Sequence, residues 1–360
     1  MKKLIALLLV LALAFTLCAC GKKAEETPQT ADAPAESGEM IIGTLSMLNK
    51  TEEEYAAYQE VRRALGRQMV KEGYAERTEG TSHQGRMTKI VFCDTLDSLL
   101  MALNAGDVDS LAIYQSVARY LCATNDNLCM PIRYDLDKER NTFAEVVLNG
   151  IFGNDFAFLM MEDNAALRDE FNAAIAAMKA DGTLDRLVKE QIDALLDGGE
   201  IKPIALPHFD GAETVKVAVT GALPPMDYVA PDGTPAGFNT AVLAEIGNRT
   251  GKNIELVVVD SLGRAAALAS GAVDAVFWTR TSSRAQERAA MTEAEREAVK
   301  AGEQAGMTEE EIALMDEVSE SINFLTYAKS DMPEGTIVTA PYFSDLLVPV
   351  LLAGGGPQGK

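Results

Sequence analysis

Three segments between residues 214 and 259 decide the fold class: TVKVAV (214–219), FNTAVLAEIGNRT (238–250) and IELVVV (254–259). The first and the third are short runs rich in valine and isoleucine, which are typical of buried strands. The middle segment is long enough for several helical turns and is followed by Gly251, a residue that favours a helix end. A strand, a helix and a strand in this order predict a parallel sheet covered by helices.

The same alternation extends along most of the chain. A helix at 262–270, a strand at 272–278 and an apolar strand at 346–352 follow the segments above. Thr51 and Glu54 form the pattern of a capping box and predict the start of a helix. The first half contains further predicted strands at 40–45, 89–93, 110–114 and 155–161 and helices at 96–105, 164–180 and 183–196.

We therefore predict an α/β protein of two lobes, 40–197 and 214–353, joined by a linker at 198–213 that is rich in Gly and Pro. Each lobe would hold a mostly parallel sheet flanked by helices, with a ligand cleft between the lobes. A charged segment, 284–321, is inserted in the second lobe. Two capping boxes in it predict a solvated helical hairpin: Thr292/Glu295 and Thr308/Glu311.

The first residues have the pattern of a secretory signal. Lys2 and Lys3 precede an apolar run at 4–17, which is shorter than the roughly 20 residues of a membrane-spanning helix. The next residues, Leu17-Cys18-Ala19-Cys20, resemble the bacterial lipobox, in which the cysteine is acylated and becomes the mature N-terminus. An ordinary signal peptide with incidental cysteines is the alternative.

From the lipobox pattern we expect a signal peptide at 1–19 and a lipidated, palmitate-bearing Cys20. Residues 20–39 contain no aromatic side chain and are expected to form a disordered tether. The protein would then work outside the cytoplasm, anchored to the cell membrane by lipid.

Composition excludes several function classes. The chain has 32 Lys and Arg against 54 Asp and Glu, a net charge of −22, which argues against a nucleic-acid partner. Only two histidines are present, so a His-based metal site or a Ser/His/Asp triad is not expected, and no cofactor is predicted. Three cysteines follow residue 20: Cys93, Cys122 and Cys129. An odd number does not make a disulfide framework, although Cys122 and Cys129 could pair.

Several motifs resemble the bacterial extracellular solute-binding proteins of family 3, the type-2 periplasmic binding proteins of amino-acid ABC importers. The strongest runs from Val215 to Ile246 and contains Leu223-Pro224-Pro225-Met226-Asp227-Tyr228 and then Gly237-Phe238-Asn239. Further matches lie at 268–275, 106–121 and 156–184. The resemblance implies a two-lobed fold that closes around a small solute.

The order of these motifs differs from that of the family. The segment at 214–280 resembles the family's first lobe but comes last, and residues 40–197 resemble the second lobe but come first. We infer a circular permutation rejoined through 198–213. Two degraded tandem copies are the alternative, although each lobe's motifs occur once.

The resemblance also implies ligand-binding residues in the segment that comes last. Met226 stands at the place of the aromatic residue that stacks on the ligand, and Tyr228, two residues on, would offer a flat face and a hydroxyl or pack at the base of the loop. Hydroxyls at Thr279 and Thr281 fall where the family binds a ligand carboxylate. The position of the family's arginine holds Gln286, and Arg280 or Arg284 would replace that arginine. Trp278 would line the cleft or belong to the core.

In the other lobe, the place of the family's ammonium-binding Asp is taken by Tyr114, which is followed by Gln115. Asn239 likewise stands where the family has an Asp. Both replacements argue against a free α-amino acid as the ligand. Ser46 and Asn49 fall where the family's anion-binding loop would lie, before the Thr51 helix.

The function implied is capture of a small polar or amino-acid-like solute by lobe closure and its delivery to an ABC permease. The protein would act as a monomer and would not be an enzyme. The alternatives are a sensory lipoprotein that acts on a membrane signalling partner and, with less support, a dehydratase-like enzyme of the same fold.

Overall fold

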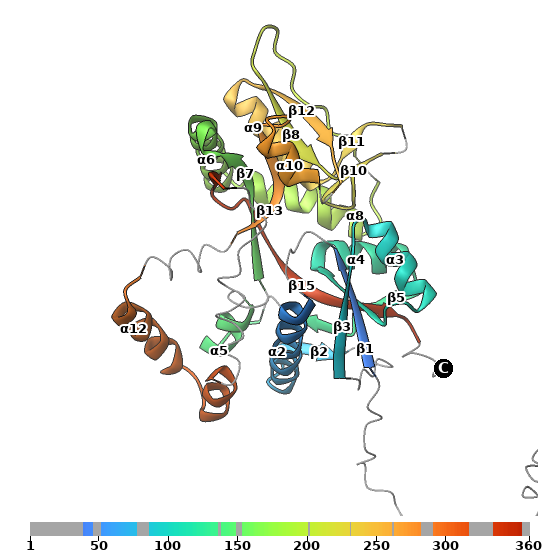
Figure 1. Ribbon diagram of the computed structural model, residues 1–360, viewed down its shortest axis with the longest axis vertical. Helices are drawn as coiled ribbons and strands as arrows, with labels where there is room; N and C mark the ends of the chain where they lie inside the picture. Colours follow the sequence, from blue (N-terminus) through green and yellow to red (C-terminus); the bar gives the residue numbers. More distant parts are fainter. Residues whose placement is uncertain are drawn as a thin grey trace, which may run out of the picture. The chain divides into compact units, whose positions relative to one another are not determined.

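The computed structural model describes residues 39–45, 52–77, 86–135, 138–148, 153–200, 202–230, 232–260, 263–281, 291–316 and 334–354 (Figure 1). The predicted signal peptide, Cys20 and most of the tether lie outside these residues. Within them, no helix is both long enough and apolar enough to cross a membrane. The described residues belong to one compact unit, which starts at Ser37.

The N-terminal sheet has three parallel strands, with the first strand of the chain in the middle. The strands, in spatial order, are β3 (Arg86–Cys93), β1 (Glu39–Leu45) and β4 (Ser110–Tyr114). This order places the carboxyl ends of β1 and β4 next to each other, because parallel strands end at the same edge. The predicted strands at 40–45, 89–93 and 110–114 are confirmed.

Two helices connect these strands, α2 (Glu52–Lys71) and α3 (Leu96–Ala105). Thr95 and Ser98 form the capping box that begins α3, and Gly106 ends the helix with a φ of 76°. Glycine suits this position because the left-handed region is strained for other residues. The predicted helix at 96–105 is confirmed.

The C-terminal sheet repeats the arrangement. Its parallel strands, in spatial order, are β12 (Asn253–Val258), β8 (Thr214–Val219) and β13 (Ala275–Thr281). The helices between them are α9 (Phe238–Thr250) and α10 (Gly263–Ala269). All five elements were predicted, with ends that differ by up to three residues.

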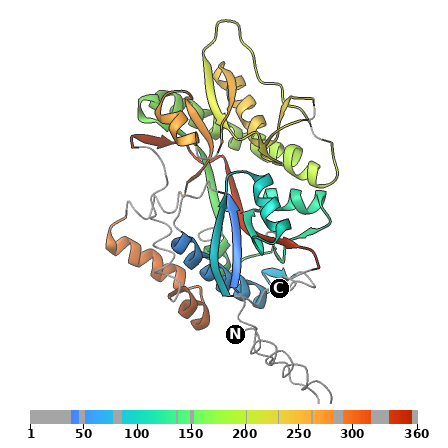
Figure 2. The ribbon, with the colours of Figure 1, turned by 45° about the vertical axis from the view of Figure 1, so that its right-hand side comes forward.

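Two long strands are exchanged between the halves of the chain. β7 (Gly153–Met161) comes from the first half but pairs antiparallel with β13 of the C-terminal sheet. β15 (Phe343–Leu352) comes from the second half but pairs antiparallel with β4 of the N-terminal sheet. The two strands also pair with each other, and Figure 2 shows β15, in red, alongside the blue and teal strands of the N-terminal sheet. We call β7 and β15 the crossing pair.

The crossing pair links the two predicted lobes, 40–197 and 214–353, whose limits stay a prediction. After β7, helices α6 (Ala165–Ala180) and α7 (Thr183–Val188) pack against α9 of the second half. β15 belongs with β4. Each sheet therefore takes strands from both halves, because antiparallel pairing of β7 and β15 buries apolar residues of both strands.

Aromatic side chains continue the hydrophobic core across the crossing pair. Phe158 of β7 stacks on Tyr342 with ring centroids 4.7 Å apart, and Phe238 of α9 lies 4.8 Å from Phe343 of β15. Buried residues of both sheets form one large cluster. The two sheets therefore share a core.

Shorter elements complete the described chain. Two short strands that the sequence did not predict, β2 (Ala75–Arg77) and β6 (Ile132–Tyr134), pair antiparallel. The remaining short elements are β5 (Leu128–Cys129), β9 (Ala222–Leu223), β10 (Asp227–Val229), β11 (Pro235–Ala236), β14 (Thr336–Val338), α4 (Gln115–Thr124), α5 (Thr142–Glu145), η3 (Glu162–Asn164), η4 (Lys189–Asp193) and α8 (Ala194–Leu196).

The charged segment is helical but not fully solvated. Helix α12 (Glu293–Gln304) begins at the predicted capping box of Thr292 and Glu295. Beyond it, Glu311 is 2% exposed and accepts a hydrogen bond of 3.0 Å from the Nδ2 of Asn141. The prediction of a wholly solvated hairpin is therefore wrong for the residues that follow α12. Met307, Leu314 and Met315 pack on the core there.

Candidate functional site

Residues predicted to bind ligand from both halves of the chain meet at the crossing pair. On one side, Arg280 and Thr281 of β13 are the Cα partners of Phe156 and Asp155 on β7. On the other side, the ring of Tyr114 at the end of β4 meets the ring of Phe156 edge-on, with centroids 4.7 Å apart. Phe156 therefore lies between the two predicted groups. We call this place the seam.

A buried carboxylate lies beside Tyr114. Asp345 of β15 is 9% exposed, and its Oδ2 accepts a hydrogen bond of 3.1 Å from the backbone N–H of Ser116 in the first turn of α4. Its Oδ1 accepts another, of 2.7 Å, from Leu346. Burial raises the pKa of Asp345 to about 6, while these hydrogen bonds and the charge of Arg119 oppose the rise. The side chain is thus mostly ionised at neutral pH.

Sequence reasoning found no acid at this place and missed Asp345. The family resemblance places Tyr114 at the position of the acid, whereas Asp345 comes from a strand of the other half. The available signal was an acid within the apolar run 342–352, where a charge needs partners.

A second acid and a hydroxyl extend the polar part of the seam. Asp155 of β7 accepts a hydrogen bond of 2.6 Å from the Oγ of Ser344 on β15. The two residues are also Cα partners in the crossing pair. Thr279, which is half-buried, lies two residues before Thr281 on the neighbouring strand.

Tyr228 of β10 lies close to residues of the first half of the chain. Its side chain is half-buried, and burial, followed by the nearby Tyr120 of α4, raises the pKa of its hydroxyl to about 12. The hydroxyl therefore keeps its proton at neutral pH and can donate a hydrogen bond. Tyr228 thus lies close to α4, the helix that follows Tyr114.

The turn that presents Tyr228 is held by a buried carboxylate. Asp227 is 1% exposed and accepts hydrogen bonds of 2.9 Å and 2.6 Å from the backbone N–H groups of Thr220 and Gly221. Burial raises its pKa to about 7, against the effect of these donors. Its role is to fix the turn, because its oxygens are already used.

Met226 and Asn239 are fully buried, so their side chains pack in the core in this structure. The Oδ1 of Asn239 accepts a hydrogen bond of 3.0 Å from the hydroxyl of Tyr342. The Nδ2 of Asn239 has no hydrogen-bond partner in the described part of the chain. Neither side chain reaches the seam surface, and their predicted ligand contacts stay predictions.

A cavity of about 520 Å³ lies next to Gln115, and we call it the α4 cavity. Its size falls in the range of roughly 300–1,000 Å³ that small-molecule sites occupy. Charged groups of both signs line it, including Arg119, Arg133, Asp135 and Asp197. A small polar solute with both charges would find partners here.

The comparison with known families concerns the C-terminal half. Residues 215–328 match the model of the bacterial extracellular solute-binding proteins, family 3. This range is less than half of the chain and contains β8, β12 and β13. It also includes the predicted ligand residues from Met226 to Arg284, whereas Tyr114 and Gln115 lie outside it.

Matches to solved structures are all at low identity. The zinc-bound ligand-binding component of an ABC-type import system from Staphylococcus aureus has 10% identity and a TM-score of 0.34, with 88% of this chain and 66% of that chain covered. This chain therefore spans just under two thirds of that relative.

Two further structures give similar values. A putative L-cystine ABC transporter protein from Listeria monocytogenes has 11% identity and a TM-score of 0.32, covering 88% and 83% of the two chains. The periplasmic aliphatic sulphonate binding protein of Escherichia coli has 12% identity and a TM-score of 0.31, covering 85% and 82%. At such TM-scores these likenesses carry no argument about the ligand.

Some predicted residues are described in part or not at all. Ser46, Asn49 and Arg284 lie outside the described residues. For Trp278, Arg280 and Thr281 the structure describes the strand but not the side chains. Their roles in a family 3 site stay predictions.

No group of three or more His, Cys, Asp or Glu side chains that could hold a metal occurs within the described residues. Cys93, Cys122 and Cys129 are all free thiols here. Burial raises the pKa of Cys122 to about 11, so this thiol stays protonated. The pairing of Cys122 with Cys129, considered from sequence, is not formed in this structure.

Proposed function

We propose that this protein is a lipid-anchored solute-binding component of an ABC importer. The observation that carries the proposal is the meeting of β13 and the β4–α4 junction on either side of Phe156. The family match to residues 215–328 supports it, because that range supplies one of the two groups. The chemistry is reversible binding, in which ligand bound by both groups favours a closed state.

The proposed solute is small and carries both an anionic and a cationic group. Hydroxyls at Thr279 and Thr281 would receive its anionic group, and Tyr228 would offer a flat face. Asp345 would receive the cationic group in place of the acid that is absent at Tyr114. A solute of this kind is an amino acid or a close relative of one.

Two features support a circular permutation. Each sheet has the same strand arrangement, with its first strand in the middle, two parallel neighbours and an antiparallel strand from the other half. Each motif of the family occurs once in the chain. Two tandem copies would instead supply two such sets. A ligand complex with two separate binding clefts would contradict the permutation.

The lipid anchor rests on Cys20 and its lipobox-like surroundings. We propose that acylated Cys20 holds the protein at the membrane, within reach of its permease. Expression of Cys20→Ala in a bacterium with lipoprotein processing should move the protein from the membrane fraction to the soluble fraction. Retention in the membrane fraction would refute acylation at this cysteine.

Thermal-shift screening of the purified chain against amino acids, small peptides and related metabolites tests the binding function. A ligand at 100 times its dissociation constant adds about 2.7 kcal/mol to the free energy of unfolding, a readily measured shift. Calorimetry would then give a stoichiometry of one. An absence of any shift over the whole set would contradict the proposal.

A further inference from the structure

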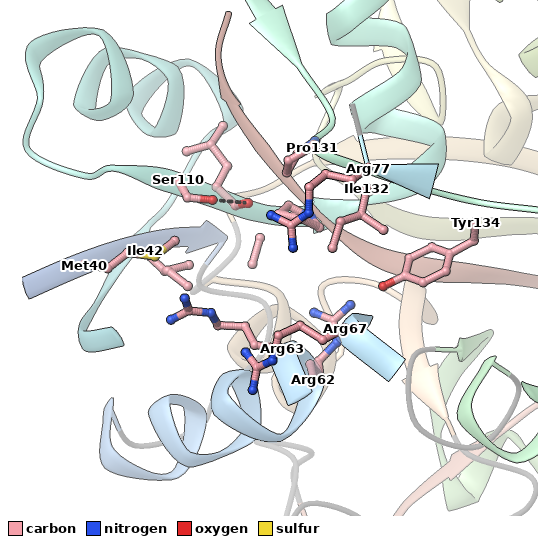
Figure 3. A pocket seen from close by; sticks show the side chains of 13 residues that line it. Met40, Ile42, Arg62, Arg63, Arg67, Arg77, Ser110, Pro131, Ile132 and Tyr134 are labelled. Atoms are coloured by element: carbon pink, nitrogen blue, oxygen red, sulfur yellow. Dashed lines mark hydrogen bonds between the residues drawn. The ribbon is translucent and has the colours of Figure 1, made fainter. Parts of the chain in front are cut away.

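A second cavity lies away from the seam, between α2 and the N-terminal sheet (Figure 3). We call it the α2 cavity. Its volume is about 120 Å³, and its lining includes Met40 and Ile42 of β1 and Ser110 of β4, from the beginnings of these strands. The seam, in contrast, is at the carboxyl ends of β4 and β13. The two sites are thus distinct.

Four arginines line this small cavity, three on α2 and one on β2. Figure 3 shows their guanidinium groups gathered around the same space: Arg62, Arg63, Arg67 and Arg77. Tyr134 of β6 also lines the cavity. Burial raises the pKa of its hydroxyl to about 12, with the charge of Arg62 acting in the opposite direction, so the hydroxyl stays protonated as a donor.

Among the described residues, the lining contains no Asp or Glu. This is unusual in a chain of net charge −22, where acids outnumber bases. Arg67 and Arg77 make no ion pair and no side-chain hydrogen bond within the described residues. Arg63 and Arg67 are four residues apart on one helix, a spacing at which like charges repel. A bound anion would remove that repulsion.

Size and charge select the kind of anion. The cavity is smaller than the engineered cavity of about 150 Å³ that holds benzene, so it suits a single compact group. A phosphate group carries about two negative charges and several strong acceptor oxygens, which several guanidinium groups can share. Apolar lining by Leu111, Ile132 and Pro349 excludes water from one side and strengthens such pairs.

We propose that the α2 cavity is a phosphate-binding site, separate from the solute site at the seam. Arg67 and Arg77 bind the phosphate oxygens directly, and Arg62 and the Tyr134 hydroxyl complete the site from the other side. The phosphate belongs either to a free ion or to the headgroup of an anionic phospholipid, since both present the same oxygens.

Calorimetric titration of the full chain with inorganic phosphate tests the site. We expect saturable binding that becomes at least about tenfold weaker in the double variant Arg67→Gln/Arg77→Gln. Both arginines are exposed residues, so these changes should leave the core intact, and an unchanged melting temperature without phosphate would verify this. The matched control is Arg186→Gln, an exposed arginine of α7 that lines neither the α2 cavity nor the α4 cavity.

Titration with glycerophosphoglycerol, the deacylated headgroup of phosphatidylglycerol, separates the two sources. Tighter binding than that of inorganic phosphate, lost in the double variant, would assign a lipid headgroup. Tighter binding of inorganic phosphate would assign the free ion. The proposal is overturned if neither compound binds, or if the double variant and Arg186→Gln bind both compounds equally well. Substitutions at Asp345 leave this site unchanged, so its outcome is independent of the proposed solute binding.

Discussion

Asp345 on β15 accepts a hydrogen bond of 3.1 Å from the backbone N–H of Ser116, at the start of α4. The two residues are far apart in the sequence and belong to different halves of the chain. Their contact places an ionised carboxylate beside Tyr114, where a solute with an amino group would need a partner. This contact gives the proposed site its negative charge.

Replacement Asp345→Asn should therefore weaken the binding of an amine-bearing solute by about ten- to hundredfold, as expected for the loss of a hydrogen-bonded charge pair. Calorimetry with the ligand found by screening measures the change. Asp126→Asn removes the same charge from an exposed turn and should bind as the parent protein does. Equal affinities in the two variants would show that Asp345 does not contact the solute.

The pH dependence of stability should reveal Asp227. Its folded pKa is raised to about 7, whereas an unfolded Asp titrates near 3.9. Between these values the folded state binds more protons than the unfolded state, so its stability rises as the pH falls. The free energy of unfolding of the parent protein minus that of Asp227→Asn should therefore increase as the pH falls from 8 to 5. Urea unfolding measures both values.

Asp181 should show the opposite sign in the same experiment. A hydrogen bond from Thr183, followed by one from Arg249, lowers the pKa of Asp181 to about 2. Its contribution to stability is present above the unfolded pKa and is lost as the pH falls toward 2. The difference between the parent protein and Asp181→Asn should shrink on acidification, and slopes of the same sign for both variants would contradict these assignments.

The buried pair of Tyr342 and Asn239 should behave as a coupled unit. Tyr342→Phe keeps the ring stack on Phe158 but leaves the Oδ1 of Asn239 without this donor, at a cost of about 1–3 kcal/mol. Adding Asn239→Leu should restore part of that loss, since both polar partners are then gone. A double-mutant cycle by chemical unfolding measures the coupling, and additive single effects would refute it.

Gly237 should be intolerant of a side chain. Its φ is 101°, and a Cβ there would lie 2.5 Å from the carbonyl oxygen of Met226. Gly237→Ala should thus destabilise the protein by several kcal/mol and disturb the turn that carries Tyr228. Gly233, with a φ of 86° and no atom within 4 Å of its Cβ position, is the matched control and should lose only about 1–2 kcal/mol.

Local pattern was sufficient for most helices and strands. The helix at 96–105 and the strand at 214–219 were predicted with the observed ends, because apolar periodicity and a closing glycine act within one segment. The pairing of β7 with β13 joins residues more than a hundred positions apart, and no local pattern encodes that distance. Local pattern therefore did not predict the crossing pair, and the lobe limits stay a prediction.

The candidate site was predictable to a similar extent. Residues near a recognised motif, such as Tyr228 and Thr279, were found, whereas Asp345 reaches the seam only through β15. The arginines of the α2 cavity were missed because Arg77 belongs to a short strand that the sequence pattern did not predict. Its convergence with α2 depends on the pairing of β2 with β6, which brings Arg77 opposite Ile132.

The crossing pair also sets the order in which the molecule can be completed. β1 is made first, yet its sheet acquires its antiparallel strand only when β15, near the end of the chain, has been synthesised. Until then β4 has an open edge, and such edges invite association with other chains. A chain that stops before residue 343 would carry this edge permanently, so nascent chains of this protein need protection over nearly the whole of their synthesis.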